Sequence, residues 1–400
     1  MQTLLENSSK DVFAEDWRNG GFGLYIHWPY CEAKCPYCDF NSHVSREIDQ
    51  SRWSRAYLLE IDRAAIAYPV RVLISGFFGG GTPSLMDPVV VHALIDAIKS
   101  HWATANDLEI TLEANPSSVE AKRFQAYSDA GVTRVSMGIQ ALNDRDLRRL
   151  GRVHNAAEAK QAFDIARKYF DRVSFDLIYA RQGQTLDQWR DELSEALSMA
   201  IDHLSLYQLT IEPGTVFASL YNRGKLRDLP DEDLSGDMYD LTQEICEKYG
   251  MPAYEVSNHA KPGAESRHNL IYWRYGDFVG IGPGAHGRVT QGERRYATEA
   301  FSNPDRWLNA VPDGSVLTFK AALDPATQAD EYLMMSLRMS EGMSLSRYES
   351  LAGKALSAST LGYLTEIGMI DASYDRVKAT QQGRVVLNSV IRELLSVGTQ

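Results

Sequence analysis

The sequence predicts an α/β fold in which helices bury a parallel sheet. Short β-branched or aromatic runs alternate with amphipathic segments up to residue 255, and this alternation is typical of repeated βαβ units. In the segment 187–200, for example, Trp189, Leu193 and Leu197 fall on one helical face. The strand candidates are Leu24–Trp28, Arg71–Phe78, Leu108–Glu113, Arg134–Ile139, Arg172–Ile178 and His203–Ile211. The handedness of such crossovers favours a doubly wound sheet or a barrel-like closure.

The chain outside this core predicts three smaller parts. Residues 1–20 are expected to form an N-terminal extension before the core of residues 21–255. Residues 256–320 are rich in glycine, and we expect a loop-rich connecting segment there. Residues 321–400 return to a helical pattern with a short possible β-ribbon, Arg376–Val386, and predict a small helical, winged-helix-like domain.

Composition and charge argue against several classes of function. The 400-residue chain has a net charge of −12 and no general basic surface, so we expect no nucleic-acid binding and a packing role for the C-terminal domain. No apolar run reaches the roughly 18 residues of a transmembrane helix. The polar first residues resemble neither a secretory signal nor a transit peptide. We expect a cytoplasmic protein, which leaves peripheral contact with a membrane acceptor open.

Three cysteines lie within eight residues, in the segment Cys31-Glu-Ala-Lys-Cys35-Pro-Tyr-Cys38. In a reducing compartment this clustering indicates metal or redox chemistry rather than disulfides. Three thiolates are one ligand short of a zinc site or an iron–sulfur cluster. Either His27, Asp39 or His43 completes a zinc site, or one metal position stays open for an exchangeable ligand.

Glycine-rich and polar residues follow the predicted strands at the points where the strands end. Gly79-Gly80-Gly81-Thr82-Pro83 follows the second strand, where glycines let a backbone approach a ligand and expose N–H groups to a carboxylate. Glu113, Gln140 and Asp176 lie at or near the ends of later strands. A tight turn and solvated polar residues are the alternative interpretation. Because the C-terminal strand ends of barrel folds build the active site, we expect these motifs to meet around one mouth.

With these surroundings, the C-x₃-C-x₂-C triplet resembles the signature of radical S-adenosylmethionine (SAM) proteins. The resemblance implies a partial (β/α)6 barrel in which three cysteines hold a [4Fe–4S] cluster and the fourth iron binds SAM. The cluster ligands implied are Cys31, Cys35 and Cys38. The residues implied to line SAM or neighbouring sites are Tyr25, Tyr37, Gly80, Gly81, Thr82, Glu113, Gln140, Arg152 and Asp176. Only the resemblance selects Arg152, and it implies that Tyr37 stacks on adenine.

Further motifs are similar to one branch of this family, which contains oxygen-independent coproporphyrinogen III oxidase and the heme chaperone HemW. The motifs are Tyr25–Cys31, Cys38–Asn41, Gly79–Pro83, Leu112–Pro116, Met137–Gln140 and Ser174–Tyr179. The oxidase has another cysteine where this chain has Phe40, and it has a longer extension before the first strand. Both differences favour the chaperone over the oxidase.

The segment from His268 to Trp273 matches an H-N-x-x-Y-W motif that the resemblance links to heme binding. Neutral imidazole can ligate heme iron, and aromatic rings can pack on a porphyrin. We therefore expect heme contacts at His268, Tyr272 and Trp273, with a hydrogen-bonded structural histidine as the alternative. His259 and His286 are further possible iron ligands.

The resemblance implies a HemW-like chaperone that binds heme and transfers it to an acceptor protein, with an electron donor for its cluster. The alternative function is the oxidase of porphyrin biosynthesis, whose activity this chain is not expected to have. One segment departs from the family, because Ala180-Arg181-Gln182 stands where Gly-Leu-Pro is common. Arg181 is expected to be a solvated loop residue or to add positive charge near a porphyrin propionate.

Overall fold

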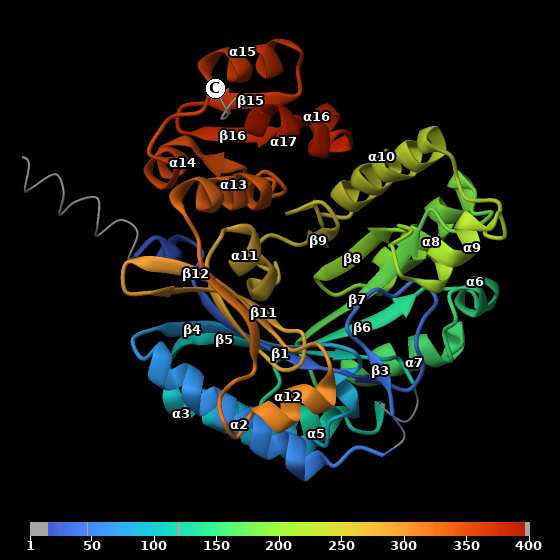
Figure 1. Ribbon diagram of the computed structural model, residues 1–400. Coiled ribbons are helices and arrows are strands. Elements are labelled where there is room, and N and C mark those ends of the chain that lie inside the picture. The colour runs from blue at the N-terminus through green and yellow to red at the C-terminus, as the bar shows by residue number, and fades with distance from the viewer. Residues whose placement is uncertain (1–14, 46, 118–120, 397–400) are drawn as a thin grey trace, which may run out of the picture.

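The computed structural model describes residues 15–45, 47–117 and 121–396, and an 11-stranded sheet lies at its centre (Figure 1). The strand order is β13-β12-β11-β10-β1-β4-β5-β6-β7-β8-β9. The strands from β10 to β8 in this order run parallel. They are β10 (Asp277–Ile281), β1 (Phe22–Trp28), β4 (Val72–Gly80), β5 (Ala103–Ala114), β6 (Arg134–Gln140), β7 (Arg172–Tyr179) and β8 (His203–Gln208). Each predicted strand overlaps one of them, and the predicted α/β class is confirmed.

Helices cover one face of the parallel strands (Figure 1). Strand residues such as Ile26, Leu112 and Phe175 form one apolar cluster with Trp53 and Trp189 of the helices. The covering helices are α2 (Gln50–Ala67), α3 (Pro88–His101), α5 (Phe124–Asp129), α7 (Ala156–Ala166), α8 (Leu186–Met199) and α10 (Glu232–Lys248). Side-chain caps start most of them, at Asp49, Asp87, Asn155, Thr185 and Asp231. None of the helices in the described ranges is both long and apolar enough to cross a membrane.

The other face of the parallel strands carries polar side chains. Because side chains alternate between the two faces of a strand, Asp176 lies opposite its neighbours Phe175 and Leu177, which belong to the apolar cluster. Asp176 stands in register with Ser205 of β8, and Glu113 of β5 with Ser136 of β6. Polar groups from successive strands therefore lie side by side on this face.

The segment 256–320, expected to be loop-rich, instead extends the sheet at both edges. β9 (Asn258–Ala260) pairs antiparallel with β8, and β10 pairs with β1. The antiparallel strands β11 (His286–Gln291), β12 (Arg294–Ala300) and β13 (Leu317–Ala322) follow, and α11 (Arg267–Trp273) and α12 (Pro304–Ala310) lie between strands. These strands are short and most carry several polar residues, and Gly280 and Gly287 interrupt β10 and β11, so their period-two apolar pattern is weak.

A C-terminal winged-helix-like domain packs beside the sheet (Figure 1). Its three-stranded sheet, β14-β16-β15, and its helices enclose an apolar cluster that includes Leu333, Leu351 and Val377. The elements are α13 (Pro325–Ser336), β14 (Met343–Ser344), α14 (Leu345–Ala352), α15 (Ala358–Glu366), β15 (Ile370–Ser373), β16 (Arg376–Ala379), α16 (Gln381–Val385) and α17 (Leu387–Ser396). The predicted ribbon over residues 376–386 is wrong in its second half, because β16 pairs back onto β15 and the chain then enters α16.

Ion pairs join this domain to the rest of the fold. Arg347 Nε lies 2.8 Å from the Asp16 carboxylate in the short helix η1 (Asp16–Asn19), and Arg288 of β11 pairs with Glu331 of α13 at 2.8 Å. Asp16 also pairs with the buried Arg295 at 3.4 Å. The start of the described chain is therefore tied both to the sheet and to the C-terminal domain.

Candidate functional site

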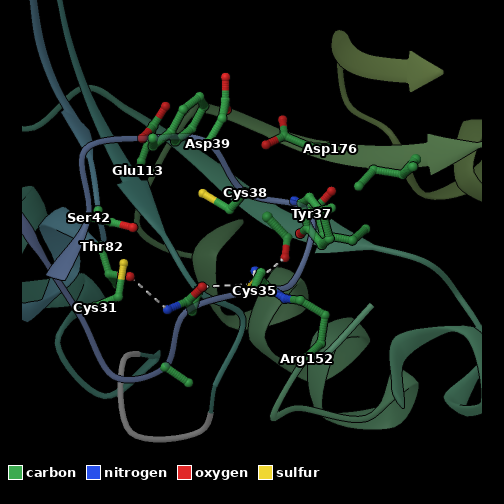
Figure 2. Close-up of a pocket in the computed structure, with 18 of the residues that line it drawn as sticks. Cys31, Cys35, Tyr37, Cys38, Asp39, Ser42, Thr82, Glu113, Arg152 and Asp176 are labelled. Atoms are coloured by element: carbon green, nitrogen blue, oxygen red, sulfur yellow. Dashed lines mark hydrogen bonds between the residues drawn. The ribbon is translucent and has the colours of Figure 1, made fainter. Parts of the chain in front are cut away.

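A cavity of about 410 Å³ opens at the carboxyl ends of the parallel strands. Its wall combines the cysteine-containing loop after β1 with residues from the ends of β4 to β8 (Figure 2). The residues expected at the cluster or SAM that line it are Cys31, Cys35, Tyr37, Cys38, Gly80, Gly81, Thr82, Glu113, Gln140, Arg152 and Asp176. Segments far apart in the sequence thus meet at one mouth.

Cys31 ends the short strand β2 (Tyr30–Cys31), and Cys35 and Cys38 lie on the loop between β2 and β3 (His43–Val44). We call residues 31–42 the cysteine loop. A turn folds this loop, in which the Cys38 N–H donates to the Cys35 carbonyl at 3.2 Å. The three thiols are free and partly exposed, and burial raises the pKa of Cys31 and of Cys38. Arg152 Nη1 lies 3.4 Å from Cys35 Sγ, where a guanidinium favours a thiolate or an anionic cluster.

Of the three candidates for a fourth zinc ligand, Asp39 lines the cavity beside the thiols, whereas both histidines make other contacts. His27 Nδ1 and Nε2 lie 3.2 Å from the Tyr25 hydroxyl and 2.9 Å from the Asn41 carbonyl oxygen. His43 Nε2 lies 3.2 Å from Asn41 Oδ1. Within the described ranges, no group of three or more His, Cys, Asp or Glu side chains is placed to hold one metal ion. Three thiols beside a roomy cavity fit a multi-atom cluster with an exchangeable ligand better than a closed zinc site.

Backbone geometry explains the glycines after β4. Gly80 has a φ of 109°, which glycine tolerates and L side chains rarely adopt. A Cβ at Gly81 would lie 2.6 Å from the Tyr30 carbonyl oxygen. The Gly81 N–H donates to the Trp28 carbonyl at 2.7 Å, and the Thr82 N–H to the Tyr30 carbonyl at 2.8 Å. These glycines let the end of β4 lie directly against the start of the cysteine loop.

Arg152 connects several parts of the wall. Its Nη2 donates to Asn115 Oδ1 at 2.7 Å and to the Gly138 carbonyl at 2.8 Å. Asn115 Nδ2 in turn donates to Thr82 Oγ1 at 3.2 Å. With its contact to Cys35, the guanidinium joins the cysteine loop to the ends of β5 and β6. Sequence reasoning does not select Asn115, although the Glu-Ala-Asn-Pro motif contains it.

Glu113 and Asp176 place two recessed carboxyl groups in the wall (Figure 2). The Gly80 N–H donates to Glu113 Oε2 at 3.2 Å, and Ser136 Oγ lies 3.5 Å from Asp176 Oδ1. Burial, and then the charge of Asp176, raises the pKa of Glu113 to about 8. Burial raises the pKa of Asp176 to about 6. Near neutral pH the pair therefore holds a proton, which a cationic or hydrogen-bond-donating ligand would displace.

Three more side chains, from Gln140, Tyr37 and Tyr207, belong to the wall. Gln140 ends β6 with a φ of 73°, in the left-handed region, and the Tyr37 ring packs 6.3 Å from the ring of Phe217 in α9 (Val216–Asn222). Tyr207 of β8 lines the cavity and is 42% exposed. Sequence reasoning misses Tyr207, although its register with Ile178 and the alternation along β8 place it on the cavity face.

The residues expected to contact heme lie on α11 and are not among those that line the cavity. His268 is buried at 2% exposure, whereas Tyr272 and Trp273 are half-buried. Tyr25 also lies outside the lining, with its ring stacked on that of His268 at 6.0 Å. The other candidate histidines are His259, buried in β9, and His286, exposed at the start of β11.

Arg181 is a buried structural cation, so the expectation of a solvated loop arginine is wrong. The residue is 3% exposed and pairs with Asp146 of α6 (Asp144–Arg149) at 3.1 Å and with Glu192 of α8 at 2.5 Å. It also donates to the Ile178 carbonyl at 2.6 Å. Two carboxylates already neutralise this guanidinium, which leaves no free charge for a propionate. Arg181 instead ties the end of β7 to two helices.

Replacing Arg181 with methionine is expected to destabilise the fold by about 3–5 kcal/mol, because two buried carboxylates lose their partner. The matched control is Arg190→Met, whose ion pair with Asp187 is exposed and should contribute less than about 1 kcal/mol. Chemical denaturation of both variants measures the difference. Equal, small losses of stability in the two variants would show that the ion pairs of Arg181 with Asp146 and Glu192 do not stabilise the fold.

Replacing Glu113 with glutamine is expected to stabilise the SAM-free protein more at alkaline than at acidic pH. The pKa of Glu113 is raised from 4.5 to about 8 in the folded state. Between these pH values the folded state therefore keeps a proton that the unfolded state has released. Stability therefore falls as pH rises, by at most about 1.4 kcal/mol per pH unit, and levels off above pH 8. Calorimetry from pH 5 to about 9 compares the two proteins. Parallel stability profiles would contradict the raised pKa.

Comparison with known proteins places this chain in a family. Residues 25–196 match the radical SAM superfamily and residues 323–386 the HemN C-terminal domain. The chain is 37% identical over 383 residues to the heme chaperone HemW of Haemophilus influenzae, covering 93% of this chain and 97% of the relative. It is 36% identical over 385 residues to the mitochondrial radical S-adenosyl methionine domain-containing protein 1 of Bos taurus. This match covers 93% of this chain and 87% of the relative.

Among solved structures, coproporphyrinogen III oxidase (HemN) from Escherichia coli, a radical SAM enzyme, superposes with a TM-score of 0.79. It shares 21% identity, and the match covers 97% of this chain and 93% of that chain, so this likeness concerns the fold. The resemblance expected from the motifs is confirmed. The chain belongs to the radical SAM superfamily, in the family of the heme chaperone HemW.

Proposed function

We propose that this protein is a heme chaperone that binds heme and transfers it to an acceptor protein, and that it carries a [4Fe–4S] cluster with exchangeable SAM. The main support is a 37% identity to HemW of Haemophilus influenzae over nearly the whole of both chains. The second support is local, because the three thiols border a cavity and the nearby histidines are engaged elsewhere.

In this proposal Cys31, Cys35 and Cys38 hold the cluster, which would supply one-electron chemistry to SAM. Arg152 balances the negative charge of the thiolates through its contact with Cys35. The glycine run brings backbone close to the cavity, and Glu113 and Asp176 accept hydrogen bonds from amino or hydroxyl groups of a ligand. Gln140 adds an amide, and Tyr37 offers a flat ring to the adenine.

Heme contact by Tyr272 and Trp273 belongs to the same proposal, since both rings are half-buried and retain exposed area. An electron donor and a heme acceptor would act as separate partners. Phe40 is 57% exposed and also lines the cavity, where it adds an apolar surface suited to a porphyrin.

Anaerobic reconstitution with iron and sulfide, followed by heme titration, tests the proposal. We expect about four irons per chain, a SAM-dependent change in the reduced cluster's spectrum, and saturable heme binding with a Soret band. A variant with all three cysteines changed to serine should lose the iron but keep heme binding. Stoichiometric zinc without cluster uptake would refute the cluster, and absence of saturable heme binding would refute the chaperone.

The oxidase remains the second candidate because the fold superposes on HemN along almost the whole chain. Incubation of the reconstituted protein with coproporphyrinogen III, SAM and a reductant distinguishes the two functions. We expect no vinyl-containing product. Its formation would replace the chaperone with oxidative decarboxylation.

A further inference from the structure

A column of aromatic rings lies on the cavity face of the sheet, between α11 and the strands β1, β4 and β10. The His268 imidazole stacks on the Phe77 ring at 4.8 Å, with 23° between the planes, and on the Tyr25 ring at 6.0 Å, with 26°. The Tyr272 ring stands edge-on to His268 at 4.8 Å and to Phe278 at 4.2 Å. Such ring contacts add specific geometry to burial. The H-N-x-x-Y-W segment thus packs directly on strands that carry the wall.

Both ring nitrogens of His268 face hydroxyl groups of the fold. Nε2 lies 3.0 Å from the Tyr272 hydroxyl, and Nδ1 lies 3.4 Å from Ser75 Oγ of β4. The side chain is buried, and burial lowers its pKa to about 3, so the imidazole is neutral. An iron ligand needs a nitrogen lone pair that faces open space. In this arrangement His268 links α11 to β4.

The column continues into the glycine run and the cysteine loop. A Cβ at Gly79 would lie 2.9 Å from the Phe77 ring and 2.9 Å from the Tyr25 ring, so these rings fill the space beside the run. The Tyr25 hydroxyl contacts His27 Nδ1 at 3.2 Å, and His27 Nε2 contacts the Asn41 carbonyl at 2.9 Å. Asn41 lies in the loop that contains the three cysteines.

The Asn41 side chain extends this chain of contacts across the sheet. Its Nδ2 donates to the Pro283 carbonyl at 2.9 Å and to the Ser302 carbonyl at 2.8 Å. The end of the cysteine loop is therefore held from two sides, by the His27 imidazole and by the segments after β10 and β12. A shift of the aromatic column would act on this loop through His27.

We infer that His268 is a positioning residue, which holds Phe77 and Tyr25 in place and through them orients the glycine run and the cysteine loop. The H-N-x-x-Y-W segment therefore sets the geometry at the cluster and SAM end of the cavity, and its histidine does not ligate heme iron. This inference rests on the proposed binding of a cluster and SAM.

The test compares His268→Ala and His268→Gln in the reconstituted full-length protein, with His92→Ala as the control. His92 lies on the surface of α3, with a side chain 54% exposed. Alanine removes the ring contacts and both hydrogen bonds, whereas glutamine retains a polar group that reaches the hydroxyls. The readouts are the SAM dissociation constant, the SAM-induced change in the electron paramagnetic resonance spectrum of the reduced cluster, and the Soret spectrum with heme.

We expect His268→Ala to weaken SAM binding about tenfold and to alter the SAM-induced spectral change, because small displacements at a binding site have large effects. Glutamine should restore most of the affinity, and the Soret spectrum should match wild type in both His268 variants and in His92→Ala. Tyr272→Phe, which removes one hydroxyl, should weaken SAM binding about threefold and serves if the alanine variant does not fold.

Unchanged SAM affinity and cluster spectra in His268→Ala would overturn the inference. Loss of the wild-type Soret spectrum in both His268 variants, without an effect on SAM, would overturn it too and assign the imidazole to heme iron. A wild-type protein that takes up a cluster but shows no response to SAM would instead refute the proposed function, and the inference with it.

Discussion

The strands β1 and β4 to β8 run in one direction, and this shared direction fixes where their loops and side chains meet. Parallel strands place all their carboxyl ends at one edge, so the cysteine loop, the glycine run and the carboxyl groups reach the same cavity. Alternation along each strand assigns one face to the helices and the other to polar groups. The strand ends and the loops that follow them therefore form the site without a long inserted segment.

Charged groups in the cavity wall have specific hydrogen-bond or ion-pair partners, but some of these groups have too few partners to offset the cost of burying their charge. Arg152 has Asn115 and a backbone carbonyl as well as Cys35, whereas Glu113 receives one backbone N–H and faces the charge of Asp176. Burial of a carboxylate is unfavourable, and at Asp176 it outweighs the charges of Arg134 and Arg152, so the pair retains a proton. A ligand that brings positive charge or hydrogen-bond donors would lower the free-energy cost of burying these ionised carboxylates.

Local patterns were sufficient to predict the parallel core and most of the cavity. The strand runs are strongly apolar, and the residues just after them, such as Gly80 and Glu113, share an edge once the strands are parallel. The strands of the segment 256–320 are harder to predict. β9 and β11 are short and polar, and β9 and β10 pair with strands distant in sequence, β8 and β1. The burial of Arg181 depends on Asp146 and Glu192, and no local signal reports that partnership.

The backbone at Gln140 disfavours the residue that occupies it. A φ of 73° costs a residue with a Cβ on the order of 1–2 kcal/mol relative to glycine, which adopts this conformation freely. Glycine would therefore favour this backbone conformation, yet it would remove the Gln140 amide from the cavity wall. At the end of β6, folding therefore favours glycine, whereas ligand recognition favours glutamine. A Gln140→Gly variant would gain stability and lose affinity for the ligand.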